Sequence, residues 1–363
     1  MIHPTVTLLA KFTEPAAHAV VSSGGDRCLV VSAHNLTAFN STELEWSTQI
    51  NEHLSRVIMI SGGRIGSLEG RTFVLRAADT GTIVAEFELE GAPADLVATP
   101  DGDVVVALHV SGATKLVRLA ADDHTVTSLE CAADLPTSES PPVLGVSDGE
   151  VIVAVAGMLH GLAPDGSWRW HADRHGFAAS PRDTDALLTT PPLDLGTKTG
   201  LVAGFGWPTG HGFFCIDAVA RRVQGIAPAE LVLHVSEAAA IAHTDSGALL
   251  VATGVDRTLA GVELDGRVRW RRDARSPVVS VVPGGPGTVF AIHSVRPSVW
   301  ALYRNVYEEP VCFAVCLDAT SGVARWTWLA PGPITAAARC GDRLFAVSEN
   351  QLFALALEES ASP

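Results

Sequence analysis

The repeating pattern of residues 311–357 constrains the fold of this chain most strongly. Apolar and polar residues alternate there in short runs, and a turn sequence interrupts these runs at short intervals. Such alternation is typical of antiparallel β-strands joined by tight turns. Weaker copies of the same cycle can be followed back to the start of the sequence, so the pattern predicts one repeated β-unit.

The period of this cycle predicts the architecture. Each cycle has room for four short strands, which we call A to D, and it ends in an apolar anchor: Phe12, Trp46, Phe87, Leu129, Trp170, Val223, Trp270 and Trp326. That spacing with four strands is the mark of a β-propeller blade. We therefore predict an all-β fold, a single β-propeller domain over residues 1–363 with eight four-stranded blades. Seven blades remain an alternative, because the cycles at 93–131 and 176–226 are placed by spacing alone.

The two ends of the chain are predicted to share a blade. Residues 332–357 provide strands A, B and C but no D strand, whereas residues 5–13 form an apolar strand without a cycle of its own. The N-terminal strand 5–13 is therefore expected to complete the blade 332–357. This pairing removes a strand edge that would otherwise be exposed.

Several turns carry a motif with a family resemblance. Between strands C and D, a Gly supplies the positive φ that a hairpin turn needs and a Trp follows, as in GSWRW, GRVRW, GVARW and the variant STELEW. This spacing resembles the pyrroloquinoline-quinone-like propeller repeat over nearly the whole chain. The resemblance implies that Trp46, Trp170, Trp270 and Trp326 are structural residues that dock between neighbouring blades.

Composition limits the partners and the cofactor. The formal net charge of −15 repels phosphate backbones and anionic lipids, so we expect neither nucleic acid nor membrane as a partner. Quinoprotein dehydrogenases with this repeat bind quinone and calcium beside a vicinal cysteine pair, but the six cysteines here include no adjacent pair. We therefore predict no cofactor. Buried reduced thiols and the lack of an apolar leader over positions 1–20 favour a cytoplasmic protein.

Two segments are longer than the cycle requires. Residues 191–212 and 293–310 are predicted to be insertions between strands B and C of the fifth and seventh blades. Long excursions from a rigid scaffold often carry function. They contain aromatic and Arg residues of the kind that dominate recognition sites. The candidate binding residues are Trp207, His211, Arg296, Trp300, Tyr303, Arg304 and Tyr307.

A second group of polar residues is predicted on the same side of the blades. His34, His109 and His293 follow strand B in three blades, and Glu69 and Glu349 take the matching place in two others. His171 and His175 are assigned to D–A links on that side. Histidine and carboxylate side chains at the mouth of a central channel could bind a divalent metal or act as general acid and base. Equivalent positions in nonadjacent blades can lie more than about 10 Å apart, too far for the bonds to one metal ion, so we predict no metal site.

These features leave two main functions open. The first is a non-catalytic cytosolic scaffold that docks a protein or peptide through loops on one face. The alternative is a small-molecule enzyme (a lyase, isomerase or cyclase) that uses a His/Glu site at the channel mouth. Sugar binding through the aromatic residues is a third possibility.

Overall fold

A computed structural model provides the structure of the chain. It describes residues 4–12, 19–22, 27–32, 34–40, 43–50, 52–110, 113–121, 126–130, 135, 141–178, 192–195, 200–205, 212–226, 233, 238–254, 258–274, 276–294 and 312–356. The regular elements of these residues are β-strands, and they contain no helix that could cross a membrane. The chain contacts group into two compact units, residues 50–227 and residues 1–49 with 228–363.

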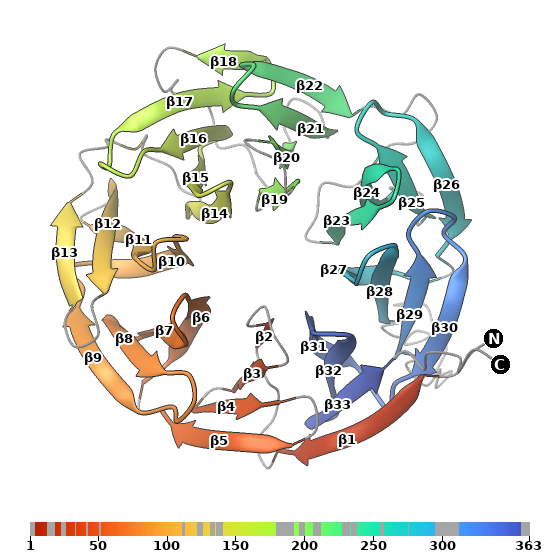
Figure 1. The fold of residues 1–363 in the computed structure, drawn as a ribbon, viewed down its shortest axis with the longest axis horizontal. Helices are drawn as coiled ribbons and strands as arrows, with labels where there is room; N and C mark the ends of the chain where they lie inside the picture. The colour runs from red at the N-terminus through yellow and green to blue at the C-terminus, as the bar shows by residue number, and fades with distance from the viewer. Residues whose placement is uncertain are drawn as a thin grey trace, which may run out of the picture. The chain divides into compact units, whose positions relative to one another are not determined.

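The unit formed by residues 50–227 contains four sheets, which we number blades 2 to 5 (Figure 1). Each is an antiparallel meander of consecutive strands, and blade 4 has a fifth strand. The strands are, in blade 2, β6 Leu54–Ile60, β7 Arg64–Glu69, β8 Thr72–Ala77 and β9 Ile83–Glu88; in blade 3, β10 Ala92–Ala98, β11 Val104–Val110, β12 Ala113–Ala121 and β13 Val126–Glu130; in blade 4, β14 Val143–Ser147, β15 Glu150–Val155, β16 Met158–Leu162, β17 Trp168–Asp173 and β18 Gly176–Ala178; in blade 5, β19 Leu193–Asp194, β20 Gly200–Phe205, β21 Gly212–Asp217 and β22 Arg222–Ile226.

The other unit contains blades 6, 7, 8 and 1. The strands are, in blade 6, β23 Ala239–Thr244, β24 Gly247–Thr253, β25 Thr258–Glu263 and β26 Val268–Asp273; in blade 7, β27 Val278–Pro283, β28 Thr288–Ser294, β29 Cys312–Asp318 and β30 Ala324–Leu329; in blade 8, β31 Ile334–Cys340, β32 Arg343–Ser348, β33 Gln351–Ala356 and β1 Thr5–Lys11; in blade 1, β2 Ala19–Ser22, β3 Cys28–Val31, β4 Asn35–Phe39 and β5 Leu44–Gln49.

Eight sheets of this kind make the fold class all-β, an eight-bladed β-propeller, so the predicted count of eight is confirmed. The shared blade is confirmed as well. In blade 8 the strand order is β1-β33-β32-β31, and β1 pairs antiparallel with β33 from Thr5 opposite Ala356 to Lys11 opposite Gln351. Figure 1 shows the red N-terminal strand beside the blue C-terminal ones.

Strand β11 explains why many strands here are apolar at every position. Val104, Val106 and Leu108 pack in a cluster with blade 2, whereas the alternate residues Val105 and Ala107 pack in a cluster with blade 4. Because both faces of the sheet are covered by neighbouring blades, both sets of side chains are buried. A strand buried on both faces therefore loses the polar–apolar alternation of a surface strand.

The motif tryptophans lie in the fourth strands, and three of them are buried. Trp270 in β26 shares an apolar cluster with blade 7, and its indole Nε1 donates to the carbonyl of Ala319 at 2.7 Å. Trp170 in β17 packs with blade 5, and Trp326 in β30 packs with blade 8. Trp46 in β5 is half-buried.

The structure differs from the sequence expectation over residues 191–212. Leu193–Asp194 and Gly200–Phe205 are β19 and β20, the first two strands of blade 5, rather than an insertion between its second and third strands. The stretch is rich in Gly and Pro and poor in β-branched residues, so its sequence does not indicate strands. The segment that separates the paired residues Phe205 and Gly212 is 206–211.

Candidate functional site

His293 is a buried residue at the end of β28. Its ring stacks on Phe313 with centroids 4.3 Å apart, and its Nδ1 lies 3.0 Å from the Ser276 hydroxyl oxygen. The Ser276 hydroxyl in turn lies 3.4 Å from the Ala274 carbonyl, so the hydroxyl can donate there and accept from His293 Nδ1. Burial lowers the pKa of His293 to about 4. The imidazole is therefore neutral at pH 7 and packs as a core side chain.

The two candidate glutamates have unlike surroundings. Glu69 accepts from the buried Arg76 guanidinium at 2.7 Å and from the Ser67 hydroxyl at 2.7 Å, so its carboxylate is engaged in an ion pair. Glu349 is exposed and has a positive φ of 49°, in the two-residue turn between β32 and β33. Its side chain lies against Gly332, where a Cβ would collide with it. Gly332 is thus the residue that leaves room for Glu349.

The remaining candidates lie in different units. His34 is exposed immediately before β4, in the unit that also contains His293 and Glu349. His109 is half-buried in β11 and belongs with Glu69 to the other unit. In the part of the chain that the structure describes, no three His, Cys, Asp or Glu side chains are grouped so that they could hold a metal ion.

A histidine pair in blade 4 was not foreseen. His171 lies within β17 rather than in a D–A link, which corrects the sequence assignment, and it pairs with His160 of β16. The two Nδ1 atoms are 2.8 Å apart, and the His160 ring also lies 5.0 Å from that of Trp168. Burial, reinforced by His171, lowers the pKa of His160 to about 3. Both rings are therefore neutral at pH 7, with one Nδ1 donating to the other.

The candidate binding residues lie outside the described residues: Trp207, His211, Arg296, Trp300, Tyr303, Arg304 and Tyr307. The described strands nevertheless fix where these segments leave the blades. Ser294 of β28 pairs with Cys312 of β29, so the segment 295–311 connects two paired residues. The predicted boundary of 293–310 shifts accordingly, because His293 and Ser294 belong to β28.

The same connection is far shorter in other blades. Only two residues separate the paired strand ends between β7 and β8, between β15 and β16, and between β32 and β33. A two-residue turn is therefore sufficient to join strands B and C in this fold. The length of 295–311 is not required by the blade.

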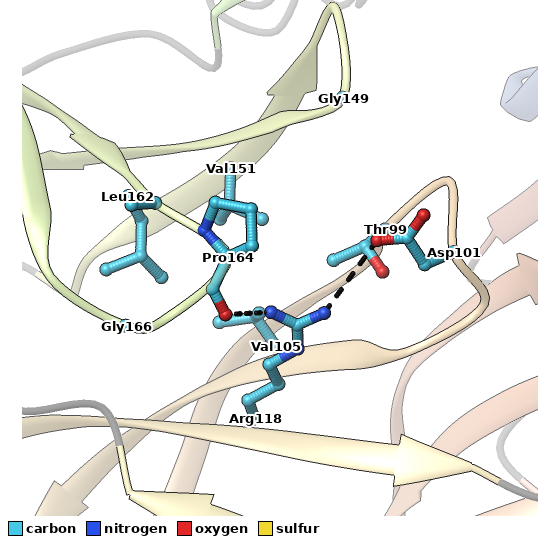
Figure 2. Close-up of a pocket in the computed structure, with 10 residues that line it drawn as sticks. Thr99, Asp101, Val105, Arg118, Gly149, Val151, Leu162, Pro164 and Gly166 are labelled. Carbon is cyan, nitrogen blue, oxygen red and sulfur yellow. Dashed lines mark hydrogen bonds and ion pairs between the residues drawn. The ribbon is translucent and has the colours of Figure 1, made fainter.

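A pocket lies between blades 3 and 4 (Figure 2). It holds about 330 Å³, counting the part that is open to solvent. Its residues come from the A–B and C–D turns and the strands beside them: Thr99, Asp101, Val105, Arg118, Gly149, Val151, Leu162, Ala163, Pro164 and Gly166. This is the opposite end of the blades from the B–C connections, where the sequence placed the functional surface.

Arg118 and Asp101, two charged residues at this pocket, differ in how closely they are paired. The Arg118 guanidinium donates to Asp103 at 2.7 Å and to the carbonyl of Pro164, so it links blade 3 to blade 4. Figure 2 shows it between Pro164 and Asp101, whose carboxylate is 3.9 Å away and 76% exposed. Asp101 therefore remains available at the mouth, above an aliphatic floor.

Sequence reasoning missed this pocket because its walls come from two blades. The sequence signal is the pair of turns Asp101-Gly102 and Pro164-Asp165-Gly166, each of which by itself indicates only a hairpin turn.

Comparisons with known proteins show the fold alone. No family model matches the chain, and no curated protein matches it. Several solved structures resemble it across nearly its full length. BamB from Moraxella catarrhalis matches with a TM-score of 0.62 at 12% identity, covering 99% of this chain and 100% of that one. Saccharomyces cerevisiae Sqt1 matches with a TM-score of 0.65 at 8% identity, covering 98% of each. The Dos1 propeller matches with a TM-score of 0.63 at 11% identity, covering 97% and 95%. The chain is thus similar to β-propeller proteins.

Proposed function

We propose that this chain is a non-catalytic, cytoplasmic β-propeller of the pyrroloquinoline-quinone-like type, a single domain over residues 1–363 that docks a protein or peptide through its B–C connections. The observation that carries the proposal is the B–C connection of blade 7. It takes up the whole segment 295–311 where blades 2, 4 and 8 use a two-residue turn, and it contains Trp300, Tyr303 and two arginines. Long loops on a rigid scaffold commonly carry recognition.

Both ends of the segment 295–311 are fixed by paired strands. His293 and Phe313 are paired across β28 and β29 and stack at 4.3 Å, and the two strands remain paired up to Ser294 and Cys312. Fixed loop ends reduce the conformational entropy that a docking loop loses when it binds. This arrangement supports a recognition role for residues 295–311.

The surroundings of two catalytic candidates, His293 and Glu69, favour docking over catalysis at these positions. His293 is occupied in stacking and Glu69 in an ion pair with Arg76. A general acid or base needs to reach a substrate atom at about 3 Å, which these committed groups do not offer. Four of the five described cysteines are buried, and buried free thiols fit the reducing compartment that we propose.

The test is a cross-linking capture from lysate of the source cells. A partner should be recovered by the wild-type chain and lost with the double variant Trp207→Ala and Trp300→Ala. Leu329→Ala is the matched control, because Leu329 is a 68% exposed apolar residue on β30 of the same blade as Trp300. If both variants and the wild type give the same capture profile, these loops do not dock the partner.

A further inference from the structure

Two cysteines from neighbouring blades meet in the core of the unit that holds both chain ends. Cys28 begins β3 of blade 1, and Cys340 ends β31 of blade 8. The two thiols share a hydrogen bond, and both lie in one apolar cluster with Phe39 and Phe345. Their exposed fractions are 0% and 1%.

The other described cysteines lie elsewhere in the blades. Cys312 and Cys316 lie on one face of β29 four positions apart, which at the strand rise is about 13 Å, too far for a disulfide. Cys215 lies in β21 of the other unit. The pair at positions 28 and 340 is therefore distinguished by the hydrogen bond between its two thiols.

Its position matters for the fold. Blade 8 contains strand β1 from the start of the chain and β31 to β33 from its end, and β31 packs against β2 of blade 1. A covalent bond from β3 to β31 would tie the N-terminal blade directly to the C-terminal strands. The loop closed by such a bond includes most of the chain, and long loops gain most from closure.

We infer that Cys28 and Cys340 form a modification site, an oxidisable pair that becomes a disulfide between blades 1 and 8 when a low-molecular-weight disulfide such as oxidised glutathione is present. The thiolate of one cysteine attacks the glutathione disulfide and releases one glutathione as thiol. The second cysteine then attacks the mixed disulfide and releases the other glutathione. The protein loses two protons and two electrons, and the reagent is reduced to two thiols.

The reaction must be slow in the folded state. The hydrogen bond to Cys340, together with burial, raises the pKa of Cys28 well above its usual range, and a thiol rather than a thiolate is a poor nucleophile. Glutathione also has to reach a buried sulfur. Oxidation therefore proceeds through transient opening where β2 and β31 pack, and reduction of the product is slow for the same reason.

The experiment uses the full-length protein in redox buffers of defined glutathione ratio. Free thiols are blocked with N-ethylmaleimide after denaturation, and the peptides are mapped by mass spectrometry without reduction. We expect a Cys28–Cys340 cross-linked peptide, an unfolding midpoint raised by at least about 3 °C, and loss of both effects in Cys28→Ala and Cys340→Ala. Cys316→Ala, another buried cysteine, should retain both.

The mapping of the wild-type chain decides the matter even if a variant fails to fold. Full alkylation of both cysteines after prolonged exposure to oxidised glutathione overturns the inference. So does a mixture of cross-links identical to that of the urea-unfolded chain. If the bond forms but the midpoint does not rise, the pair does not tie the two blades.

Discussion

Trp170 and Trp270 carry the same sequence motif but anchor in different ways. Each lies over a glycine of the adjacent strand, Gly161 or Gly261, where a Cβ would collide with the indole. The Trp270 indole then donates to Ala319 in the turn of the next blade, whereas the Trp170 indole donates to the carboxylate of Glu150 in its own blade at 2.9 Å. The position of the Trp is thus common to both, and its hydrogen-bond partner is not.

The difference originates in the following blade. Blade 7 has a turn in which Asp318 accepts from the backbone of Thr320 and Ser321, and Gly322 lies where a Cβ would meet the Trp270 ring. Blade 5 has no glycine at that place, and Arg221 takes the positive φ of 50° instead. The Trp270 indole thus uses the turn of the next blade, whereas the buried Glu150 carboxylate accepts from the Trp170 indole, whose neighbouring turn lacks that glycine.

Where the motif is missing, polar contacts join the blades. Asp95 of blade 3 accepts from the Leu144 backbone of blade 4 at 2.9 Å and forms an ion pair with Arg56 of blade 2. Arg118 makes a second contact from blade 3 to blade 4 through Pro164. These contacts connect three consecutive blades without a docking Trp.

The largest effect is expected when β1 is removed, because β1 completes blade 8, on which Trp326 packs. Deletion of residues 1–13 leaves β33 with an unpaired apolar edge in place of β1. We expect insoluble protein or a fall in the unfolding midpoint of at least about 10 °C. Circular dichroism melting of the purified chain checks this, and an unchanged midpoint would show that β1 contributes little.

Truncation of the two tryptophans tests whether both are equally structural. Trp170→Ala and Trp270→Ala should each lower the free energy of unfolding by about 3–5 kcal/mol, because a large cavity opens between packed blades. Urea denaturation followed by circular dichroism gives the values. The exposed Leu329→Ala is the control and should change stability by less than about 0.5 kcal/mol. A loss under about 1 kcal/mol at either Trp would contradict the docking role.

Acid should weaken both units through one buried histidine each. His160 and His293 have pKa values lowered from 6.5 to about 3 and about 4, so below pH 6.5 the unfolded chain binds protons that the folded chain does not. Stability is then lost as pH falls, by roughly 1.4 kcal/mol per pH unit for each group, or roughly 2 kcal/mol at pH 5. His293→Phe keeps the stacking but cannot titrate, and it should lose about 2 kcal/mol less than wild type between pH 7.5 and 5. Equal losses in urea titrations would mean that His293 does not contribute.

The smallest expected effect separates the contribution of the indole hydrogen bonds to stability from that of the packing. Trp170→Phe leaves the buried Glu150 carboxylate without its indole donor and should cost about 1.5–3 kcal/mol beyond packing. Trp270→Phe leaves only the Ala319 carbonyl without that donor and should cost about 0.5–1.5 kcal/mol. Denaturation midpoints of both variants check the order, and the reverse order would contradict the distinct roles assigned to the two partners.

The fold was largely predictable because the blade has a strong local signal. Apolar alternation and Gly-containing turns located the strands of blade 7 and blade 8, and the unpaired apolar strand at the N-terminus indicated its partner. The signal failed where local chemistry is ambiguous. The Gly- and Pro-rich residues 191–212 concealed β19 and β20, and the polar end of WRWHAD concealed that His171 is still within a strand.

The site was less predictable than the fold, because it depends on contacts between distant residues. Nothing adjacent in sequence indicates that His293 stacks on Phe313, that Glu69 pairs with Arg76, or that Asp101 and Pro164 line one pocket. These relations follow from strand register and from packing between blades. Sequence periodicity places a residue on a strand, but it does not specify the neighbour across the blade.

In the function that we propose, residues 295–311 dock a partner, and the blade itself does not need them to fold. The most direct measurement replaces this connection with the dipeptide Asn-Gly, the length used in blade 8, and compares partner capture and unfolding midpoint with the wild type. We expect a midpoint within about 2 °C of wild type and loss of the captured partner. Retention of the same partner by this otherwise folded variant would contradict it.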